Sequence, residues 1–301
     1  MYDVIIIGAG PAGITAAIYA ARKKLTILVI TKDIGGQAAL SGDVENYTGY
    51  QFITGPELAL KFEEHLRKFD IALKENESVK ELKKLGSRVE VKTDKETYYA
   101  RSVIIASGKR SRGLDVEGEK EFKNKGLTYC ATCDGPLFSG KDVVVIGGGN
   151  SALDAAIQLI KIAAKIYLIN ITDSLSGDKV MQDMVRTSQK VKILNSTQVS
   201  AILGDKMVSA VKIRKNDIEE QIAVQGVFVE IGLIPNSEFA KDVQKNKLGE
   251  IIINSYNETN VPGIFAAGDV SDIPEKQIVI AAGEGSKAAL GVFKYLIYNR
   301  D

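Results

Sequence analysis

The only two cysteines of this 301-residue chain stand two residues apart in the segment TYCATCDGPLF, Thr128–Phe138. This spacing suits a metal clamp, a structural disulfide, or a thiol pair that closes and reopens a disulfide. A structural zinc site needs four ligands, and the chain adds only one histidine, His65, to Cys130 and Cys133. The residue types therefore favour a redox-active pair and no metal.

The expected cellular location supports the same interpretation. The N-terminal stretch MYDVIIIGAGPAG has an apolar run without a basic segment before it, so it predicts a strand and not a signal peptide. We therefore expect a cytoplasmic protein. Because thiols are kept reduced in the cytoplasm, a permanent structural disulfide is disfavoured there.

Asp134 directly follows the second cysteine. A carboxyl group at this position could move the protons that thiol–disulfide exchange releases and takes up. The alternative is a turn residue that precedes Gly135 and Pro136. The residue pattern is compatible with both roles.

A strand, a glycine-rich turn and a helix of small residues follow one another twice, at Asp3–Ile30 and Asp142–Asn170. Continuous apolar runs such as Val4–Ile7 and Val143–Ile146 are typical of parallel strands covered on both faces. The first turn is a G-x-G-x-x-G fingerprint, in which a helix N-terminus holds the pyrophosphate of a dinucleotide. Its candidate ligands are Gly8, Gly10, Pro11, Ala12 and Gly13. In the second turn an alanine takes the third glycine position, and the candidates are Gly147, Gly149, Asn150, Ser151 and Ala152.

The end of the strand after the second turn should contact the adenosine ribose of a nucleotide. Asn170 stands there, followed by Ile171, Thr172 and Asp173, and no arginine lies within Asn170–Ser176 to receive a 2′-phosphate. The sequence therefore favours NADH over NADPH, with Asn170 or Asp173 bonding a ribose hydroxyl. The alternative is that this second site binds no nucleotide.

The segment GIFAAGDV, Gly263–Val270, resembles a short strand, and a helical pattern follows it at Gln277–Ile297. The simplest topology returns this segment to the first domain. The sequence thus predicts an α/β protein with two Rossmann-like dinucleotide-binding domains, the second inserted into the first. We expect the first domain at residues 1–112 and 242–301 and the second at 113–241.

Composition limits the classes of partner. The chain is 45% hydrophobic and 26% charged, with a net charge of +1 and charges of both signs mixed along it. These values are those of a globular protein and give no basic footprint for a nucleic acid or a membrane surface. We therefore expect small-molecule or protein partners, no nucleic acid and no membrane.

Motifs along almost the whole chain together resemble the low-molecular-weight thioredoxin reductase family. They are GAGPAG, GGQ at Gly35–Gln37, VENYTGY at Val44–Tyr50, IIASG at Ile104–Gly108, CATCDG, GGGNSA and FAAGDV. The segments CDGPLF, VMQDMV, LGEIIIN and KQIVIAAGEGSKAAL are especially similar to the flavoprotein part of the F subunit of alkyl hydroperoxide reductase.

This resemblance implies FAD in the first domain, a nicotinamide domain that contains the dithiol, and a homodimer. It implies that Cys133 lies against the flavin as a charge-transfer thiolate, that Cys130 attacks the disulfide of a partner, and that Asp134 is the acid/base. In addition to the first glycine turn, it implies FAD contacts from Thr31, Lys32, Gly35, Gly36, Gln37, Asn46, Ala106, Gly108, Gly268, Asp269, Val270, Gln277 and Ile278.

The sequence departs from the family at two places. Thioredoxin reductases have a His-Arg-Arg run where this chain has NITDSLS, and the hydroperoxide reductase relatives have a glutamate where Asn170 stands. Those relatives also have an N-terminal thioredoxin-like extension, whereas this sequence opens on the FAD strand. We therefore expect a separate thioredoxin- or glutaredoxin-like protein to receive the electrons, and it could in turn supply a peroxiredoxin.

The sequence predicts a flavin-dependent disulfide reductase that transfers electrons from the donor to FAD, then to the Cys130–Cys133 disulfide, then to a protein disulfide. One alternative keeps this reaction but replaces the nicotinamide with reduced ferredoxin or a deazaflavin. Another alternative is a redox-sensing flavoprotein that does not turn over.

Overall fold

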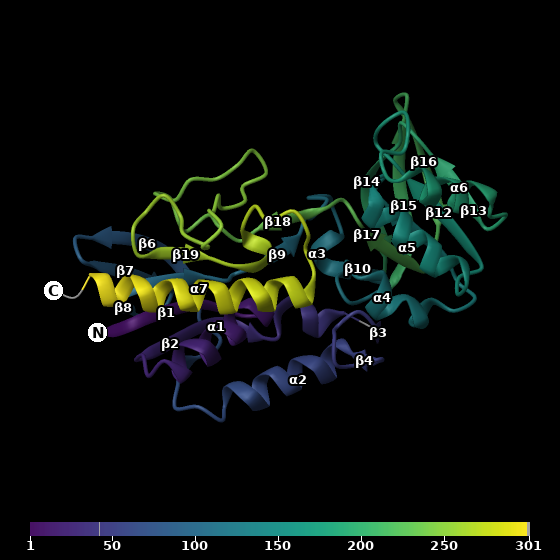
Figure 1. Cartoon of the computed structure of the whole chain (residues 1–301). Coiled ribbons are helices and arrows are strands. Elements are labelled where there is room, and N and C mark those ends of the chain that lie inside the picture. The colour runs from purple at the N-terminus through teal and green to yellow at the C-terminus, as the bar shows by residue number, and fades with distance from the viewer. Residues whose placement is uncertain (42, 300–301) are drawn as a thin grey trace. The chain divides into compact units, whose positions relative to one another are not determined.

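The computed structural model describes residues 1–41 and 43–299, apart from the side chains of Asp43 and Cys133. The chain forms two compact units (Figure 1). Unit 1 consists of residues 1–110 and the chain from Ile234 onward, and unit 2 is Ser111–Leu233. The α/β fold, with the second unit inserted into the first, is as predicted.

Unit 1 is built on a seven-stranded sheet. In order across the sheet its strands are β5 (Ala72–Lys74), β2 (Ile27–Ile34), β1 (Tyr2–Ala9), β8 (Thr97–Ile105), β7 (Arg88–Thr93) and β6 (Val79–Leu85). A further strand, β19 (Ile264–Ala266), pairs in parallel with β8. This pairing returns the C-terminal segment to the first unit, which confirms that part of the predicted topology.

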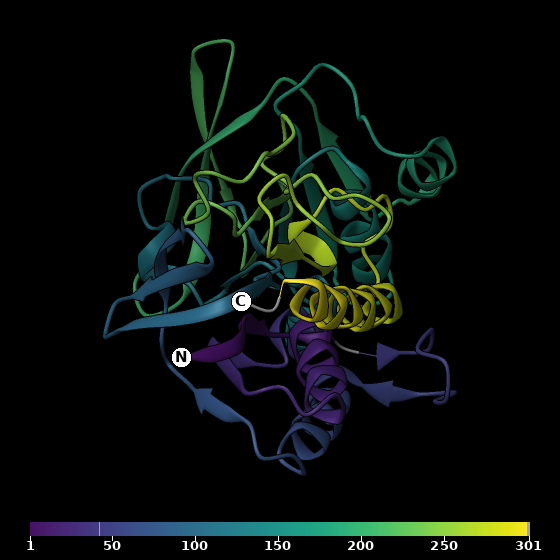
Figure 2. The same cartoon turned by 60° about the vertical axis from the view of Figure 1, so that its left-hand side comes forward.

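Both faces of the β1 strand are covered. Val4 and Ile6 pack with helices α1 (Pro11–Arg22) and α7 (Ile278–Tyr298), which lie side by side in Figures 1 and 2. Ile5 and Ile7 belong to the core on the opposite face, with residues of β6 and β7. A strand buried on both faces needs apolar residues at successive positions, which explains the continuous run.

Shorter elements complete unit 1. They are η1 (Gly36–Leu40), β3 (Asp43–Val44), β4 (Ile53–Thr54), α2 (Gly55–Leu66) and η3 (Gly268–Val270). Helix α2 begins with a capping box, in which Thr54 and Glu57 satisfy each other's backbone N–H groups.

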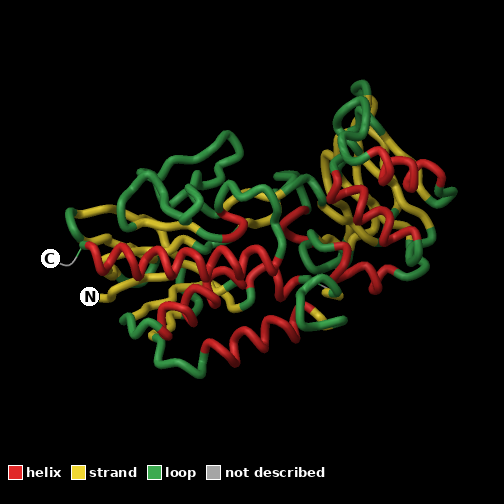
Figure 3. Tube along the Cα trace, in the orientation of Figure 1, coloured by secondary structure: helices red, strands yellow, loops and turns green. Residues whose placement is uncertain are grey.

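Unit 2 contains a five-stranded parallel sheet in the order β10 (Leu127–Thr128), β17 (Gly226–Val229), β11 (Asp142–Ile146), β12 (Lys165–Ile169) and β13 (Val191–Leu194). One face packs against α5 (Asn150–Ile160) and α6 (Lys179–Thr187) (Figure 3). The other face packs against an antiparallel sheet of β14 (Gln198–Gly204), β15 (Val208–Lys215) and β16 (Ile218–Ala223). The short helix α3 (Glu119–Phe122) precedes β10 in the sequence. Two more short helices, α4 (Ala131–Asp134) and η2 (Gly135–Phe138), connect β10 to β11.

The chain crosses between the units in two short strands, β9 (Lys109–Ser111) and β18 (Leu233–Pro235), which pair with each other. The second crossing lies at residues 233/234 and not at the predicted 241/242. Asn236 explains the difference, because its N–H donates to the carbonyl of Gly108 at 2.9 Å and its side-chain amide donates to Ser107 at 2.8 Å. These bonds fix the chain to unit 1 as soon as it leaves β18. Within the described part of the chain, no helix combines the length and apolar character needed to cross a bilayer.

Candidate active site

The first glycine turn connects β1 to α1 and permits very close backbone contacts. Gly8 has φ +104°, and a Cβ there would lie 2.3 Å from the carbonyl oxygen of Ala106. A Cβ on Gly13 would lie 1.9 Å from the carbonyl oxygen of Gly8. Gly10 caps α1 without any side-chain hydrogen bond, and Pro11 occupies the first turn. The N–H groups of this first turn therefore face no side-chain cap and can bind a phosphate.

Two segments of unit 1, η3 and α7, converge on the start of α1. A Cβ on Gly268, in η3, would lie 2.9 Å from the Cβ of Ala12, and a Cβ on Gly285, in α7, would lie 2.0 Å from the carbonyl oxygen of Ala12. Asp269 in η3 is half-buried. Burial raises the pKa of its carboxyl group, against the opposite effect of Lys276 and a second lysine. The fold thus brings the predicted Ala12, Gly268 and Asp269 together.

Other predicted FAD contacts surround this point. The Asn46 side-chain amide donates to the Gln277 side chain at 3.1 Å, and Gln277 is the N-cap of α7. The Gln37 amide donates to a backbone carbonyl of β9 at 3.4 Å. A Cβ on Gly36 would lie 3.4 Å from the Cα of Gly10, so the Gly35–Gln37 loop contacts the glycine turn. The remaining candidates in this unit are the buried Gly35, Ala106 and Val270, the half-buried Gly108 and Ile278, and the exposed Lys32.

The side chain of Thr31, a predicted FAD contact, is hydrogen-bonded within the protein. Its side chain is buried, and its hydroxyl accepts a hydrogen bond from the N–H of Ala9 at 3.2 Å and donates to the carbonyl of Asp33 at 2.5 Å. The hydroxyl thus acts as donor and as acceptor in hydrogen bonds within the protein. Thr31 therefore connects the ends of β1 and β2, a role that the sequence prediction did not include.

The second glycine turn connects β11 to α5 in unit 2. Gly147 has φ +141°, and a Cβ there would lie 2.2 Å from the carbonyl oxygen of Glu230. Gly149 is the N-cap of α5 and, like Gly10 in unit 1, has no side-chain cap. The predicted Ser151 is exposed in the first turn of α5, and Ala152 is fully buried beneath it. This turn offers the same uncapped N–H groups as the first.

The side chain of Asn170, a predicted ribose contact, is likewise hydrogen-bonded within the protein. It is 4% exposed, and its amide nitrogen donates to the carbonyls of Thr172 and Ser174, at 3.1 and 2.9 Å, and to the side chain of Asn195 at 3.3 Å. Its amide oxygen accepts from the Thr172 hydroxyl at 3.0 Å. Asn170 therefore uses its polar atoms to shape the loop, whereas Asp173 in that loop is exposed.

The same loop folds onto the second glycine turn. The N–H of Ser176 donates to the carbonyl of Gly148 at 2.8 Å, and the N–H of Asp178 donates to the predicted Asn150 side chain at 2.7 Å. The loop is thus fixed by the protein's own hydrogen bonds, and Ile171–Asp178 includes two aspartates but no arginine.

The dithiol segment lies between β10 and α4. Cys130 is half-buried and disulfide-bonded, while the side chain of Cys133 lies outside the described residues. The hydroxyl of Thr128 accepts a hydrogen bond from the N–H of Cys130 at 3.1 Å and donates to the carboxylate of Asp134. The N–H of Asp134 donates to the carbonyl of Cys130 at 3.2 Å. Thr128 thus positions the predicted acid/base carboxylate beside the N-terminal cysteine.

Sequence reasoning missed two polar residues of this region, Thr128 and Glu230. Thr128 has a weak signal, because it stands two residues before the cysteine pair. Glu230 has none in the local sequence, since it lies far along the chain at the end of β17. Burial raises its pKa to about 7, and the Asp154 carboxylate adds to this, while a hydrogen bond from the N–H of Ala131 acts in the opposite direction.

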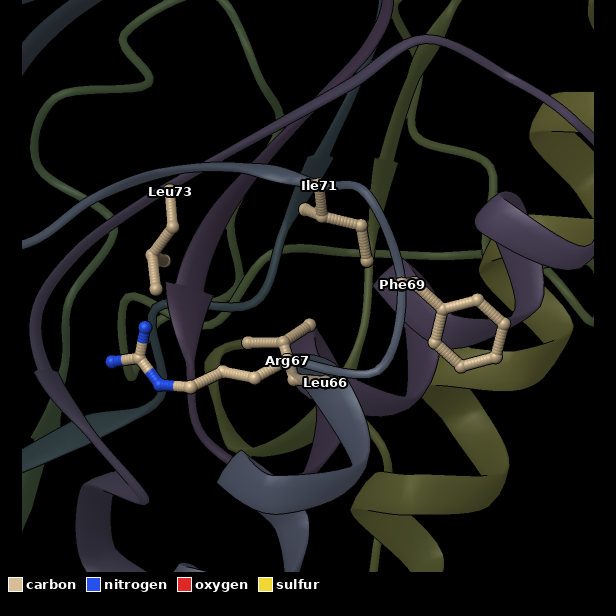
Figure 4. Close-up of a pocket in the computed structure, with 5 residues that line it drawn as sticks. All are labelled: Leu66, Arg67, Phe69, Ile71 and Leu73. Carbon is tan, nitrogen blue, oxygen red and sulfur yellow. The ribbon is translucent and has the colours of Figure 1, made fainter.

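A small hollow of about 200 Å³ in unit 1 is lined by Leu66, Arg67, Phe69, Ile71 and Leu73 (Figure 4). These residues connect the end of α2 to the start of β5. They therefore lie at the amino ends of the parallel strands, whereas the first glycine turn follows the carboxyl end of β1. This hollow is separate from the candidate cofactor residues.

Comparison with known proteins supports the predicted resemblance. The chain is 41% identical over 302 residues to an NADH dehydrogenase of Ferdinandcohnia aciditolerans, covering 99% of this chain and 58% of the relative. It is 43% identical over 303 residues to the F subunit of alkyl hydroperoxide reductase in Xanthomonas campestris pv. phaseoli, covering 98% and 57%. The crystal structure of Lactococcus lactis thioredoxin reductase matches with a TM-score of 0.84 and 34% identity, over 99% of this chain and all of that one.

The chain thus spans less than two thirds of the length of these two curated relatives but the whole of the solved thioredoxin reductase. Residues 2–285 match the model of the pyridine nucleotide-disulphide oxidoreductases. The two uncapped glycine turns and the cysteine pair therefore lie in an oxidoreductase fold of known type. The chain belongs to the pyridine nucleotide-disulphide oxidoreductase family.

Proposed function

We propose that the protein is a flavin-dependent disulfide reductase, which transfers electrons from NADH through FAD and the Cys130–Cys133 pair to a thioredoxin- or glutaredoxin-like protein. One observation supports this most strongly. In unit 2, β10 and β11 flank β17 in a parallel sheet, so that the carboxyl ends of β10 and β11 lead to Cys130 and to Gly147 at the same edge. Ligands of open α/β sheets bind at this edge. Nucleotide turn and dithiol are therefore neighbours within one unit.

The residues of unit 1 fit FAD. The uncapped first turn of α1 would hold the pyrophosphate of FAD. The rest of the cofactor would be held by the hydrogen-bonded pair Asn46 and Gln277, by Asp269 and by the start of α7. FAD, when bound, accepts two electrons from a hydride donor and passes them to sulfur. We also propose that the protein works as a homodimer, as the resemblance implies.

The residues of unit 2 would then reduce the partner. The Cys130 thiolate attacks one sulfur of the partner disulfide, forms a mixed disulfide and releases the other partner sulfur as a thiolate. Cys133 next attacks Cys130, which frees the second partner sulfur and restores the Cys130–Cys133 disulfide. Asp134, held by the Thr128 hydroxyl, would supply and remove protons at these sulfurs. The partner gains two electrons and two protons, and the dithiol loses them.

The electron donor is the finer part of the proposal. NADH is favoured because Ile171–Asp178 offers no guanidinium to a 2′-phosphate, and because a relative is named NADH dehydrogenase. With Asn170 committed to the loop, we assign the ribose contact to the exposed Asp173. Reduced ferredoxin or a deazaflavin is the alternative donor.

Anaerobic titration tests the donor and the function together. NADH should bleach the bound flavin in a stoichiometric titration, and the kcat/KM for NADH should exceed that for NADPH at least tenfold. Comparable values for both nucleotides would contradict the specificity, and bleaching by reduced ferredoxin alone would establish the alternative donor. Reduction of thioredoxin or glutaredoxin disulfides under the same conditions should be catalytic. Flavin reduction without turnover on either protein would instead favour a redox-sensing flavoprotein.

A further inference from the structure

Glu230 lies between two segments that the proposed function uses. Its N–H donates to the carbonyl of Ile146 at 2.8 Å, and its own carbonyl oxygen lies against Gly147 of the second glycine turn. On the other side of β17, the strand β10 ends at Thr128, two residues before Cys130. The backbone of Glu230 is therefore fixed at the carboxyl edge of the parallel sheet of unit 2, between the second glycine turn and the dithiol segment.

The carboxyl group of Glu230 contacts the dithiol segment. It accepts a hydrogen bond from the N–H of Ala131, which directly follows Cys130 and is 5% exposed. The carboxyl group has no ion-pair partner among the residues that the structure describes. Burial accordingly raises its pKa to about 7, so that it changes charge near neutrality.

A second chain of hydrogen bonds holds helix α4, which begins at Ala131. The Thr132 hydroxyl donates to the side-chain oxygen of Gln158 at 3.0 Å, and the Gln158 nitrogen donates to Asp154 at 2.7 Å. Helix α4 is thus connected to α5 through Thr132 and to the end of β17 through Ala131. The position of the residue after Cys130 depends on both connections.

The charged and titratable groups around Glu230 are few. Helix α5 contributes the Asp154 carboxylate, which also raises the pKa of Glu230. The dithiol segment that follows β10 includes Cys130, which is disulfide-bonded in this structure, and Asp134, whose carboxylate accepts from the Thr128 hydroxyl. The turn Gly147–Ala152 contributes no charged residue. Beside β10, the Tyr129 hydroxyl donates to a glutamate of α3. No cation in this set offsets a negative charge on Glu230.

We propose that Glu230 is a positioning residue for the dithiol: through its hydrogen bond to Ala131 it orients the Cys130 segment, and its charge controls how readily the Cys130 sulfur becomes a thiolate. This inference rests on the proposed function in taking Cys130 as the attacking sulfur. An ionised carboxylate next to a thiol disfavours a second negative charge, whereas the protonated carboxyl group does not. The two titrations are therefore coupled, and the thiolate of Cys130 forms at higher pH when Glu230 is ionised.

The test uses the Cys133→Ser variant, in which Cys130 is the only thiol. Its rate of alkylation by iodoacetamide is measured from pH 5 to pH 10 in the FAD-loaded protein. The added Glu230→Gln change keeps the size of the side chain and an acceptor for the Ala131 N–H but removes the charge. It should lower the thiol pKa by about one unit where Glu230 is ionised, above about pH 7. At such a pH, as long as it still lies below both thiol pKa values, alkylation should be about tenfold faster, and at pH 5, where Glu230 is already protonated, the two rates should be nearly equal.

Glu220→Gln is the matched control, because Glu220 is exposed in β16 of the same unit. It should leave the alkylation profile unchanged. Glu230→Ala removes both charge and hydrogen bond and should shift the profile in the same direction, so the inference stays testable if Glu230→Gln does not fold. An unchanged profile in the Glu230 variants, or an equal shift in Glu220→Gln, would overturn the inference.

The alkylation assay needs neither a donor nor turnover, so it separates this inference from the proposed function. If Glu230→Gln shifts the alkylation profile as expected but the protein with both cysteines reduces no disulfide, only the proposed function is contradicted. If the protein reduces disulfides but the Glu230 variants leave the alkylation profile unchanged, only the inference about Glu230 is contradicted. A step near pH 7 that disappears in Asp134→Asn but persists in Glu230→Gln would assign the coupling to Asp134 instead.

Discussion

Replacing Glu250 with glutamine should strongly destabilise unit 1. The Glu250 carboxylate is 9% exposed and lies 2.7 Å from the Lys109 ammonium and 3.2 Å from that of Lys276. Its second oxygen accepts from the Asn246 amide at 2.7 Å. Although burial alone would raise its pKa, these donors lower it from 4.5 to about 2. Lys109 begins β9, and Lys276 precedes the N-cap of α7, so Glu250 joins the crossing to the candidate cofactor segment.

The depressed pKa gives the size and the pH range of the effect. At about 1.4 kcal/mol for each pH unit, a change from 4.5 to about 2 contributes about 3 kcal/mol to the free energy of unfolding. Because the folded-state value is the lower one, this contribution is complete above about pH 5 and is lost as the pH falls toward 2. Glu250→Gln also leaves two partly buried lysines without their carboxylate, so the expected loss at pH 7 is about 3 kcal/mol.

Urea unfolding of both proteins at several pH values measures this loss. The difference between wild type and Glu250→Gln should shrink by about 1 kcal/mol between pH 6 and pH 3.5. Glu238→Gln is the control, because its ion pair with Arg110 is 61% and 49% exposed and should contribute less than about 1 kcal/mol. Equal losses in the two variants, or a difference that does not vary with pH, would refute the reasoning.

Two further predictions concern the dithiol. Asp134→Asn should slow reduction of a protein disulfide by about 100-fold and leave flavin reduction by NADH nearly unchanged, because only the sulfur steps need a proton moved; stopped-flow measurement of the two half-reactions checks this, and equal losses would indicate a structural turn residue. Cys133→Ser should accumulate a mixed disulfide between Cys130 and a thioredoxin-like protein, detected by mass spectrometry, because the resolving thiol is missing. Cys130→Ser should form no adduct and should show a long-wavelength charge-transfer band, and adducts on Cys133 would reverse the assignment of the two sulfurs.

The sequence predicts the layers of both units well, because their signals are local. Val4–Ile7 is apolar at successive positions, and such a strand can only be stable with both faces covered. The glycines of the first turn are equally specific, since a Cβ at Gly8 or Gly13 would meet a backbone oxygen within 2.3 Å. Steric requirements of this kind are visible in the residue types themselves.

Polar residues at strand ends are harder to predict. Thr31 and Asn170 both stand where a nucleotide contact is expected, and both use their hydrogen-bonding atoms within the protein. Threonine and asparagine readily bond nearby backbone groups, so their presence at such an edge does not distinguish a ligand contact from a loop that holds itself. Asn195, which accepts a hydrogen bond from the Asn170 amide, lies in a different loop, and only folding brings the two residues together.

Glu230 shows why lateral strand order matters more for a site than local motifs do. Nothing in the run GVFVEIG separates this glutamate from an ordinary surface residue at the end of a strand. It becomes a candidate only because β17, although late in the sequence, lies between β10 and β11 and so ends between the cysteine pair and the second glycine turn. Where a strand is inserted between two strands with functional loops, the residue after its carboxyl end has access to both loops. In this fold that residue is Glu230, whose pKa burial raises to about 7 and whose carboxyl group accepts from the N–H of the residue after Cys130.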